Sequence, residues 1–198
     1  YLLDIMECSS IDGEPHTFDW LLHTSGTLQT ELPFKHDALE CFNKGAVPSP
    51  PDRKYSPGAL VPSSYDYIRE VESLSTAADW HIAVMDAVWA ADVWKIKGRA
   101  MRVSMMGDAD KKVFKGVCAA AARDVYDPVL LVRRRAKHTT YIALHTPGDG
   151  AFDVECVLNE AGTIACRVSE TSSGKADVLV KQNAAGRLEV AAVEFSEV

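Results

Sequence analysis

The sequence predicts an all-β protein, an antiparallel β-sandwich of many short strands with one long proline-rich excursion at about residues 33–78. Two observations support this fold class. Apolar runs recur roughly every 8 to 12 residues and are separated by turn-forming residues. No segment has the length of an ordinary helix, and the alanines at positions 119–122 are too few to nucleate one. With 198 residues, of which 47% are hydrophobic, the chain is long enough for one large domain or two small ones.

The first 32 residues are expected to form a β-hairpin. Tyr1–Cys8 is a mainly apolar run, and His16–Thr24 is a second one. Between them, Asp12 and Gly13 form the Asp-Gly pair that is a strong signal for a hairpin turn.

Residues 33–78 are predicted to be irregular, as a long loop over the surface. Proline prevents regular structure, and five prolines crowd the middle of this segment: Pro48, Pro50, Pro51, Pro57 and Pro62. Loops of this length are uncommon without a role. The tyrosines at positions 55, 65 and 67 indicate that part of the segment packs against the rest of the protein. For residues 67–73 a short strand and a single helical turn remain open.

From residue 79 to residue 198 the chain is predicted to supply the regular strands of the sandwich. Glycine, proline and aspartate mark the turns between them. The predicted strands are 80–90, 94–106, 112–122, 129–135, 139–146, 151–159, 163–171, 175–182 and 187–195.

The overall charge argues against two classes of partner. A net charge of −7 and a pI near 5.3 give no general attraction for nucleic acid or for an anionic membrane surface. Arg133, Arg134 and Arg135 form the one conspicuous basic run. Because side chains alternate along a strand, the three cannot share one face. A solvated strand edge and a dedicated anion clamp both remain open for this run.

The five cysteines do not form a disulfide framework by their spacing, and no two are arranged as CxxC. Cys156 and Cys166 are placed so that they would face each other across a hairpin. Buried, reduced thiols are the alternative for the same two residues. The redox compartment is not decided by this pattern.

Two stretches resemble heparinase II/III-like polysaccharide lyases. The first joins the strand at residues 1–5 to His16-Thr17-Phe18-Asp19-Trp20-Leu21-Leu22-His23, which is similar to an H-x-x-D-aromatic-x-x-H pattern of that family, and Gly26 follows it. The second is Pro128–Pro147, which is similar to a late hairpin of the same sandwich. The order of short strands after residue 79 also fits.

The resemblance implies a role in the cleavage of uronate-containing polysaccharides by β-elimination. In such enzymes a base removes the proton next to the uronate carboxyl group, and an acid protonates the departing oxygen. Most catalytic residues belong to an α/α toroid and to strands upstream of the match. Residues 1–5 read as the middle of a strand, so we expect an upstream part that is absent from this chain. The resemblance implies that this part is the N-terminal toroid. We therefore expect the isolated chain to be inactive and assign it no catalytic residue.

Asp4 and His23 are the sharpest candidate pair. In an antiparallel hairpin, the residue numbers of opposed partners add up to a nearly constant value. A turn at Asp12-Gly13 therefore places residue 4 opposite a residue near 21 to 23. A carboxylate and an imidazole would then meet, as a zinc site requires. The resemblance implies that both are ligands of a structural zinc ion whose third ligand lies upstream. An ordinary polar strand residue and a hydrogen-bonded histidine are the alternative.

Four further residues are candidates for binding sugar: His16, Trp20, Trp89 and Trp94. His16 completes the family motif beside a turn, and exposed aromatic rings stack on the apolar faces of sugars. Packing in the core is the alternative for the tryptophans, most of all for Trp20. No nucleophile motif accompanies the other histidines.

The sequence thus predicts the β-sandwich part of a heparinase II/III-like lyase, which supports the catalytic toroid and lines the cleft for an anionic polysaccharide or oligosaccharide. The alternative is a carbohydrate-binding or structural sandwich module without chemistry. The resemblance implies a periplasmic or secreted location.

Overall fold

The computed structural model describes residues 1–37, 68–85, 100–107, 111–119, 126–148, 152–160, 163–184 and 187–195, and its regular elements there are all β-strands. No helix suited to crossing a membrane occurs in these ranges. The strands are β1 (Leu2–Ser9), β2 (His16–His23), β3 (Thr27–Gln29), β4 (Lys35–His36), β5 (Arg69–Thr76), β6 (Trp80–Met85), β7 (Ala100–Met105), β8 (Lys111–Ala119), β9 (Tyr126–Ala136), β10 (His138–Pro147), β11 (Phe152–Glu160), β12 (Thr163–Glu170), β13 (Ala176–Ala184) and β14 (Arg187–Phe195).

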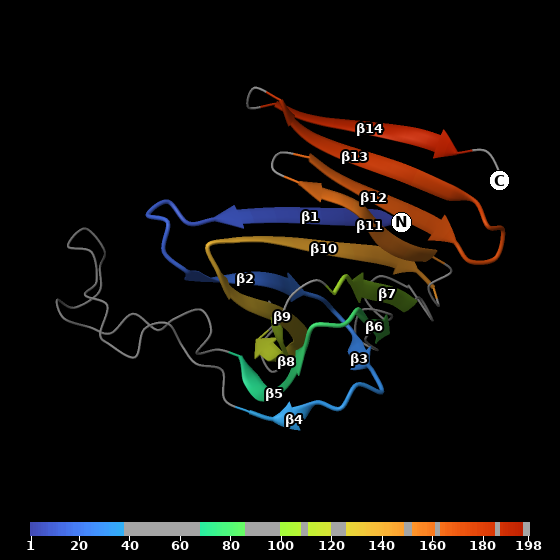
Figure 1. Ribbon diagram of the computed structural model, residues 1–198. Helices are drawn as coiled ribbons and strands as arrows, with labels where there is room; N and C mark the ends of the chain where they lie inside the picture. Colours follow the sequence, from blue (N-terminus) through green and yellow to red (C-terminus); the bar gives the residue numbers. More distant parts are fainter. Residues whose placement is uncertain are drawn as a thin grey trace, which may run out of the picture.

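The strands form three antiparallel sheets that pack in layers (Figure 1). The central sheet has the order β1-β10-β7-β6-β3, and the flanking sheet has the order β2-β9-β8-β5-β4. The C-terminal sheet is the meander β11-β12-β13-β14, drawn in orange and red. The predicted all-β sandwich is confirmed, with a third layer that covers the second face of the central sheet.

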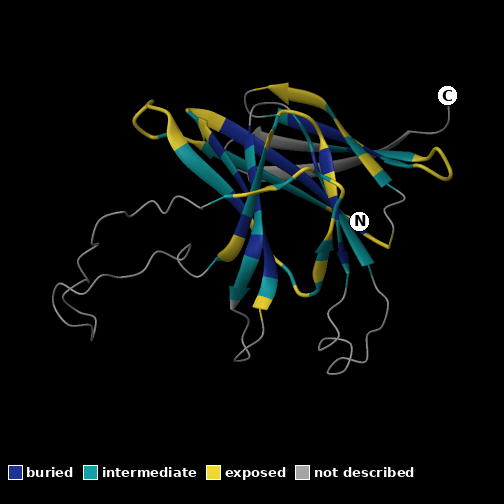
Figure 2. Ribbon diagram, turned by 90° about the horizontal axis from the view of Figure 1, so that it is seen from below, coloured by how far each residue is buried: buried dark blue, intermediate teal, exposed yellow. Residues whose placement is uncertain are grey.

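The main core lies between the central and flanking sheets. Trp80, Ile82 and Val84 of β6 alternate inward, as residues of a strand with one face on the core must. Trp20 and Leu130 meet them from the flanking sheet. In Figure 2 the buried residues gather in the middle of the strands, between the layers. Burial of these apolar side chains is the main force that holds the two sheets together.

The other face of the central sheet packs on the C-terminal sheet through a smaller cluster. Ile142 of β10 contacts Ile164 and Cys166 of β12, with Leu3 and Ile5 of β1 at the margin. Strands β1 and β10 are therefore apolar on both faces, which explains why the run at the start of the chain alternates poorly.

The predicted hairpin of residues 1–32 is wrong. Strand β1 pairs with β10 over its whole length, and β2 pairs with β9, so the two consecutive strands lie in different sheets. Residues 10–15 carry the chain from one layer to the next. Each strand has an apolar face to bury, and facing each other across the sandwich buries both of them.

The predicted hairpin at Pro128–Pro147 is a second corner of the same kind. Strand β9 belongs to the flanking sheet and β10 to the central sheet, with only Lys137 between them. The two corners touch, since the amide of Ser10 donates to the carbonyl of Lys137 at 2.8 Å. The two stretches that carry the family resemblance therefore pair with each other along both sheets.

The irregular excursion was predicted too long at both ends. Strand β4 and the eight-residue strand β5 lie inside it. Of the two alternatives for residues 67–73, a short strand and a helical turn, β5 shows that the strand is correct from Arg69 onward. A β-bulge between Arg69 and Glu72, with Glu70 at a φ of 54°, breaks the alternation that would have revealed β5. Residues 38–67, with all five prolines and the three tyrosines, lie outside the described residues.

The strands predicted after residue 79 are confirmed as β6 to β14, with boundaries that shift by a few residues. The ends predicted at 86–90, 94–99 and 120–122 fall outside the described residues. Turn-forming residues locate strand ends well because few residues tolerate the backbone conformations of tight turns.

Candidate functional site

A groove of about 530 Å³ lies where neighbouring ends of β5, β8 and β9 meet. It is lined by five basic residues, two residues with hydroxyl groups and one alanine: Lys111, Lys112, Arg133, Arg134, Arg135, Ser75, Thr76 and Ala77. We call it the basic groove. Lys111 is buried, and its Nζ donates to the carbonyl of Met106 at 3.0 Å. Strand register brings its members together, because Ser75 pairs with Lys112 and Lys112 pairs with Arg133. This concentration of positive charge contrasts with the net charge of −7 of the whole chain.

Two of its arginines point to opposite faces of the flanking sheet, as the predicted alternation requires. Arg133 holds Asp19 in a bidentate ion pair, with nitrogen–oxygen distances of 2.8 and 2.9 Å. Arg134 is buried, donates to Thr139 Oγ1 and Thr140 O at 3.0 and 2.7 Å, and stacks over Tyr141. Arg134 thus fixes the corner between β9 and β10.

The accessible part of the groove is formed by Lys112 and Arg135. Arg135 is exposed, and we find no ion pair for it among the described residues. Lys112 is partly exposed, with its Nζ 2.5 Å from Asp37 Oδ2 and 4.9 Å from the ring centre of Phe114. Ammonium, guanidinium and hydroxyl groups are the donors that bind carboxylate or sulfate oxygens. The groove therefore has the chemistry of a site for an extended anion.

Asp4 faces the core and meets Trp20 across the two sheets. The indole nitrogen of Trp20 donates to Asp4 Oδ2 at 2.8 Å, and the Trp20 ring is only 4% exposed. The ring of His145 lies 6.2 Å from that of Trp20. Burial lowers the pKa of His145, and the negative charge of Asp4 acts in the opposite direction. Trp20 is thus a core residue and offers no open face to a sugar, which corrects its prediction as a binding platform.

The structure does not bring Asp4 and His23 together. Trp20 and Leu22 of β2 pack into the main core, so His23 points away from it and is exposed. No group of three potential metal-ligating side chains occurs in the described ranges. Within the described residues, Asp4 contacts Trp20, and we find no contact between Asp4 and His23. A zinc site completed from upstream stays a prediction of the resemblance.

His16 is exposed at the start of β2 and is tied to the preceding turn. Its Nε2 lies 2.8 and 2.9 Å from the two carboxylate oxygens of Asp12. The pKa of Asp12 is lowered, first by the amide of Glu14 and then by His16. This contact explains His16 as part of a turn, and its role toward sugar stays a prediction. Trp89 and Trp94 lie outside the described residues.

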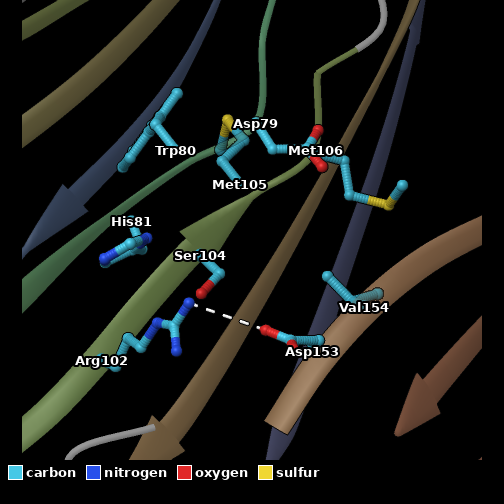
Figure 3. A pocket seen from close by; sticks show the side chains of 9 residues that line it. All are labelled: Asp79, Trp80, His81, Arg102, Ser104, Met105, Met106, Asp153 and Val154. Carbon is cyan, nitrogen blue, oxygen red and sulfur yellow. Dashed lines mark ion pairs between the residues drawn. The ribbon is translucent and has the colours of Figure 1, made fainter.

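A smaller cavity of about 180 Å³ lies between the central sheet and β11 (Figure 3). Arg102 reaches across it to Asp153, with a nitrogen–oxygen distance of 3.6 Å. Ser104 lies beside the guanidinium group and pairs in register with His81. Two acids, Asp79 and Asp153, line this cavity with one arginine, so it is less suited to an anion than the basic groove.

The sequence pointed to Arg133–Arg135 but not to the rest of the groove. Lys111-Lys112 opens a strand, where two lysines are ordinary, and Ser75 and Thr76 lie in a segment predicted to be irregular. Only the pairing of β5 with β8 and of β8 with β9 makes these residues neighbours. That pairing is not encoded in any local pattern.

Comparisons with known proteins give no identification, because no protein-family model and no curated protein matches the chain.

Proposed function

We propose that this chain is the β-sandwich part of a heparinase II/III-like polysaccharide lyase, and that it holds an anionic, uronate-containing polysaccharide in the basic groove. The observation that carries the proposal is the groove itself. Five basic residues line one hollow of an otherwise acidic chain. Lys112 and Arg135 are the two of them whose side chains are accessible, whereas Lys111, Arg133 and Arg134 are held within the fold. A repeating carboxylated sugar offers negative charges along its length, and a basic groove complements them.

The pairing of the two resembling stretches supports the family part of the proposal. Residues 1–26 and 128–147 resemble the family at two separate places in the sequence. They build the middle of the sandwich together, because β1 pairs with β10 and β2 pairs with β9. Stretches that pack as one unit are expected to resemble a family together.

The groove residues would bind and orient the substrate. Pairing a uronate carboxylate with Lys112 and Arg135 stabilises the negative charge that develops when the neighbouring proton leaves. No histidine, tyrosine or carboxylate is among the described residues that line the groove, and the carboxylates of Asp19 and Asp37 beside it are paired with Arg133 and Lys112. The base and acid would come from the toroid. Zinc and a periplasmic or secreted location belong to the same proposal and rest on the resemblance.

Calorimetric titration of the chain with a polyuronate oligosaccharide tests the site. We expect the Lys112→Ala, Arg135→Ala double variant to bind about five- to tenfold more weakly, because each exposed ion pair contributes up to about 1 kcal/mol. The matched control is Lys175→Ala, an exposed lysine on the C-terminal sheet, which should bind like the wild type. Added salt should weaken wild-type binding more than that of the double variant.

Unchanged affinity in the double variant would contradict the groove as the binding site. Equal affinity for single-stranded DNA of matching charge would reduce the groove to a generic polyanion surface. Neutral dextran should not bind at the groove.

A binding module without chemistry is the second candidate, favoured by the lack of a candidate base in the groove. Release of unsaturated uronate products separates the two. A protein that joins the chain to its toroid should release them, and the double variant in that protein should release them more slowly. Binding without product release would favour the module.

A further inference from the structure

Cys156 and Cys166 lie directly opposite each other in the hairpin of β11 and β12. Both side chains point toward the central sheet, where they join the cluster around Ile142. We propose that these two cysteines are a dithiol site, which a disulfide oxidant such as oxidised glutathione converts into a cross-strand disulfide.

The register alone meets the distance requirement of a disulfide. Directly opposed residues of an antiparallel pair have Cα atoms about 4.5 or 5.5 Å apart, depending on the type of pair. Disulfides form over Cα separations of about 4.4 to 6.8 Å. Both types of pair fall in this range, so the backbone needs no rearrangement. The bulge between Cys156 and Leu158 adds local freedom for the side chain of Cys156 to turn.

The other described cysteines lack such a partner. Cys8 pairs in register with Thr139, and Cys118 pairs with Asp127. The opposed pair is therefore specific to the C-terminal sheet in the described part of the chain.

The two thiols have different access to an oxidant. Cys166 is fully buried, whereas Cys156 is half-buried on β11, which is the edge strand of its sheet. Burial, followed by the charge and hydrogen bond of Cys156, raises the pKa of Cys166 to about 12. The thiolate is the reactive form, so Cys156 is the thiol that meets the oxidant first.

The reaction proceeds in two exchanges. The Cys156 thiolate attacks one sulfur of oxidised glutathione, forms a mixed disulfide and releases one glutathione thiolate. Cys166 then loses its proton and attacks Sγ of Cys156, which releases the second glutathione. The protein loses two protons and two electrons, and one glutathione disulfide becomes two glutathione thiols. The second exchange is the slow one, because the Cys166 thiolate is scarce at neutral pH.

The cross-link would tie the edge of the C-terminal sheet to its second strand. It closes a short loop, and short loops still remove conformational freedom from the unfolded chain. We expect the melting temperature of the oxidised chain to lie roughly 5 °C above that of the reduced chain.

Digestion with a glutamate-specific protease tests the site, because Glu160 lies between the two cysteines and Glu155 and Glu170 flank them. The chain is equilibrated in glutathione buffers of increasing oxidised fraction, its remaining thiols are alkylated, and it is digested without reductant. We expect peptides 156–160 and 161–170 to stay joined and to separate on reduction. The Cys8→Ser, Cys118→Ser double variant should give the same joined pair.

The Cys156→Ser variant changes a half-buried position and should fold, as far-ultraviolet circular dichroism would verify, while losing the joined peptides and the rise in melting temperature. Alkylated thiols at both positions in folded, fully oxidised wild type would overturn the proposal. Cys156 joined to any cysteine other than Cys166 would overturn it as well.

Discussion

The two faces of the central sheet pack against very different partners. Toward the flanking sheet it buries three large aromatic side chains, Trp20, Trp80 and Tyr141, within one extended cluster. Toward the C-terminal sheet the buried cluster of described residues contains Ile142, Ile164 and Cys166. Polar contacts add to this second interface, namely Arg102 with Asp153 and the hydroxyl of Tyr1 with Asp177.

This difference indicates a division of roles. The central and flanking sheets are each built from strands that lie far apart in the chain. Together they form the unit that positions the basic groove. The C-terminal sheet is a meander, and its described contacts with this unit centre on Ile142, Ile164 and Cys166. The free energy of unfolding should therefore depend most on the first interface. The Cys156–Cys166 cross-link would stabilise the C-terminal sheet on the side of the second interface.

The largest expected effect is in the main core, at Trp20. Replacing Trp20 by alanine removes a buried ring and the indole donor to Asp4, and we expect a loss of about 3 to 5 kcal/mol in the free energy of unfolding. Urea denaturation measures this loss. Trp20→Phe is the matched control, since it keeps an apolar ring and removes the donor, and it should lose less. A loss below about 1 kcal/mol for Trp20→Ala would refute the central role of this interface.

A matched pair of isoleucines compares the two interfaces directly. Ile82 in the main core and Ile164 in the C-terminal cluster are both almost fully buried, at 0% and 1% exposure. Truncation to alanine costs about 2 to 5 kcal/mol, depending on how far the site collapses. We expect Ile82→Ala near the upper end and Ile164→Ala near the lower end, because Ile82 lies in the larger of the two clusters of described residues. Equal losses in urea denaturation would remove the distinction between the interfaces.

The smallest expected effect is a pH dependence of the main core through His145. Because burial lowers its folded-state pKa, protonation favours the unfolded chain. The stability is intact above the unfolded-state pKa of about 6.5 and is lost as the pH falls through that value toward the lower folded-state pKa. We expect His145→Gln to flatten the fall in melting temperature between about pH 7 and pH 5. The exposed His138→Gln is the control, and an unchanged slope in His145→Gln would contradict this account.

The sequence was most informative where contacts are local. The C-terminal sheet was predicted strand by strand because its neighbours in space are neighbours in the chain, and turn residues mark each reversal. The same rule failed for residues 1–32. Asp12-Gly13 is a turn signal in a hairpin and in a sandwich corner alike, and only the partners β9 and β10 distinguish the two.

The candidate site was predicted only in fragments. Arg133–Arg135 were visible as a basic run, but the register of β8 on β9, which makes Lys112 the neighbour of Arg133, was not predicted. The pair Asp4 and His23 depended on the failed hairpin, and the structure places Asp4 against Trp20. Predictions that depend on one assumed register fail together when the register is different.

Hydrogen exchange of the chain, measured by mass spectrometry with and without a polyuronate oligosaccharide, tests the central claim most directly. We predict that the oligosaccharide slows exchange in the peptides that contain residues 75–77, 111–112 and 133–135. Exchange in β12 and β13 should not change. Protection around Arg102, Ser104 and Asp153 instead, or no protection at saturating oligosaccharide, would contradict the basic groove as the site that holds the polysaccharide.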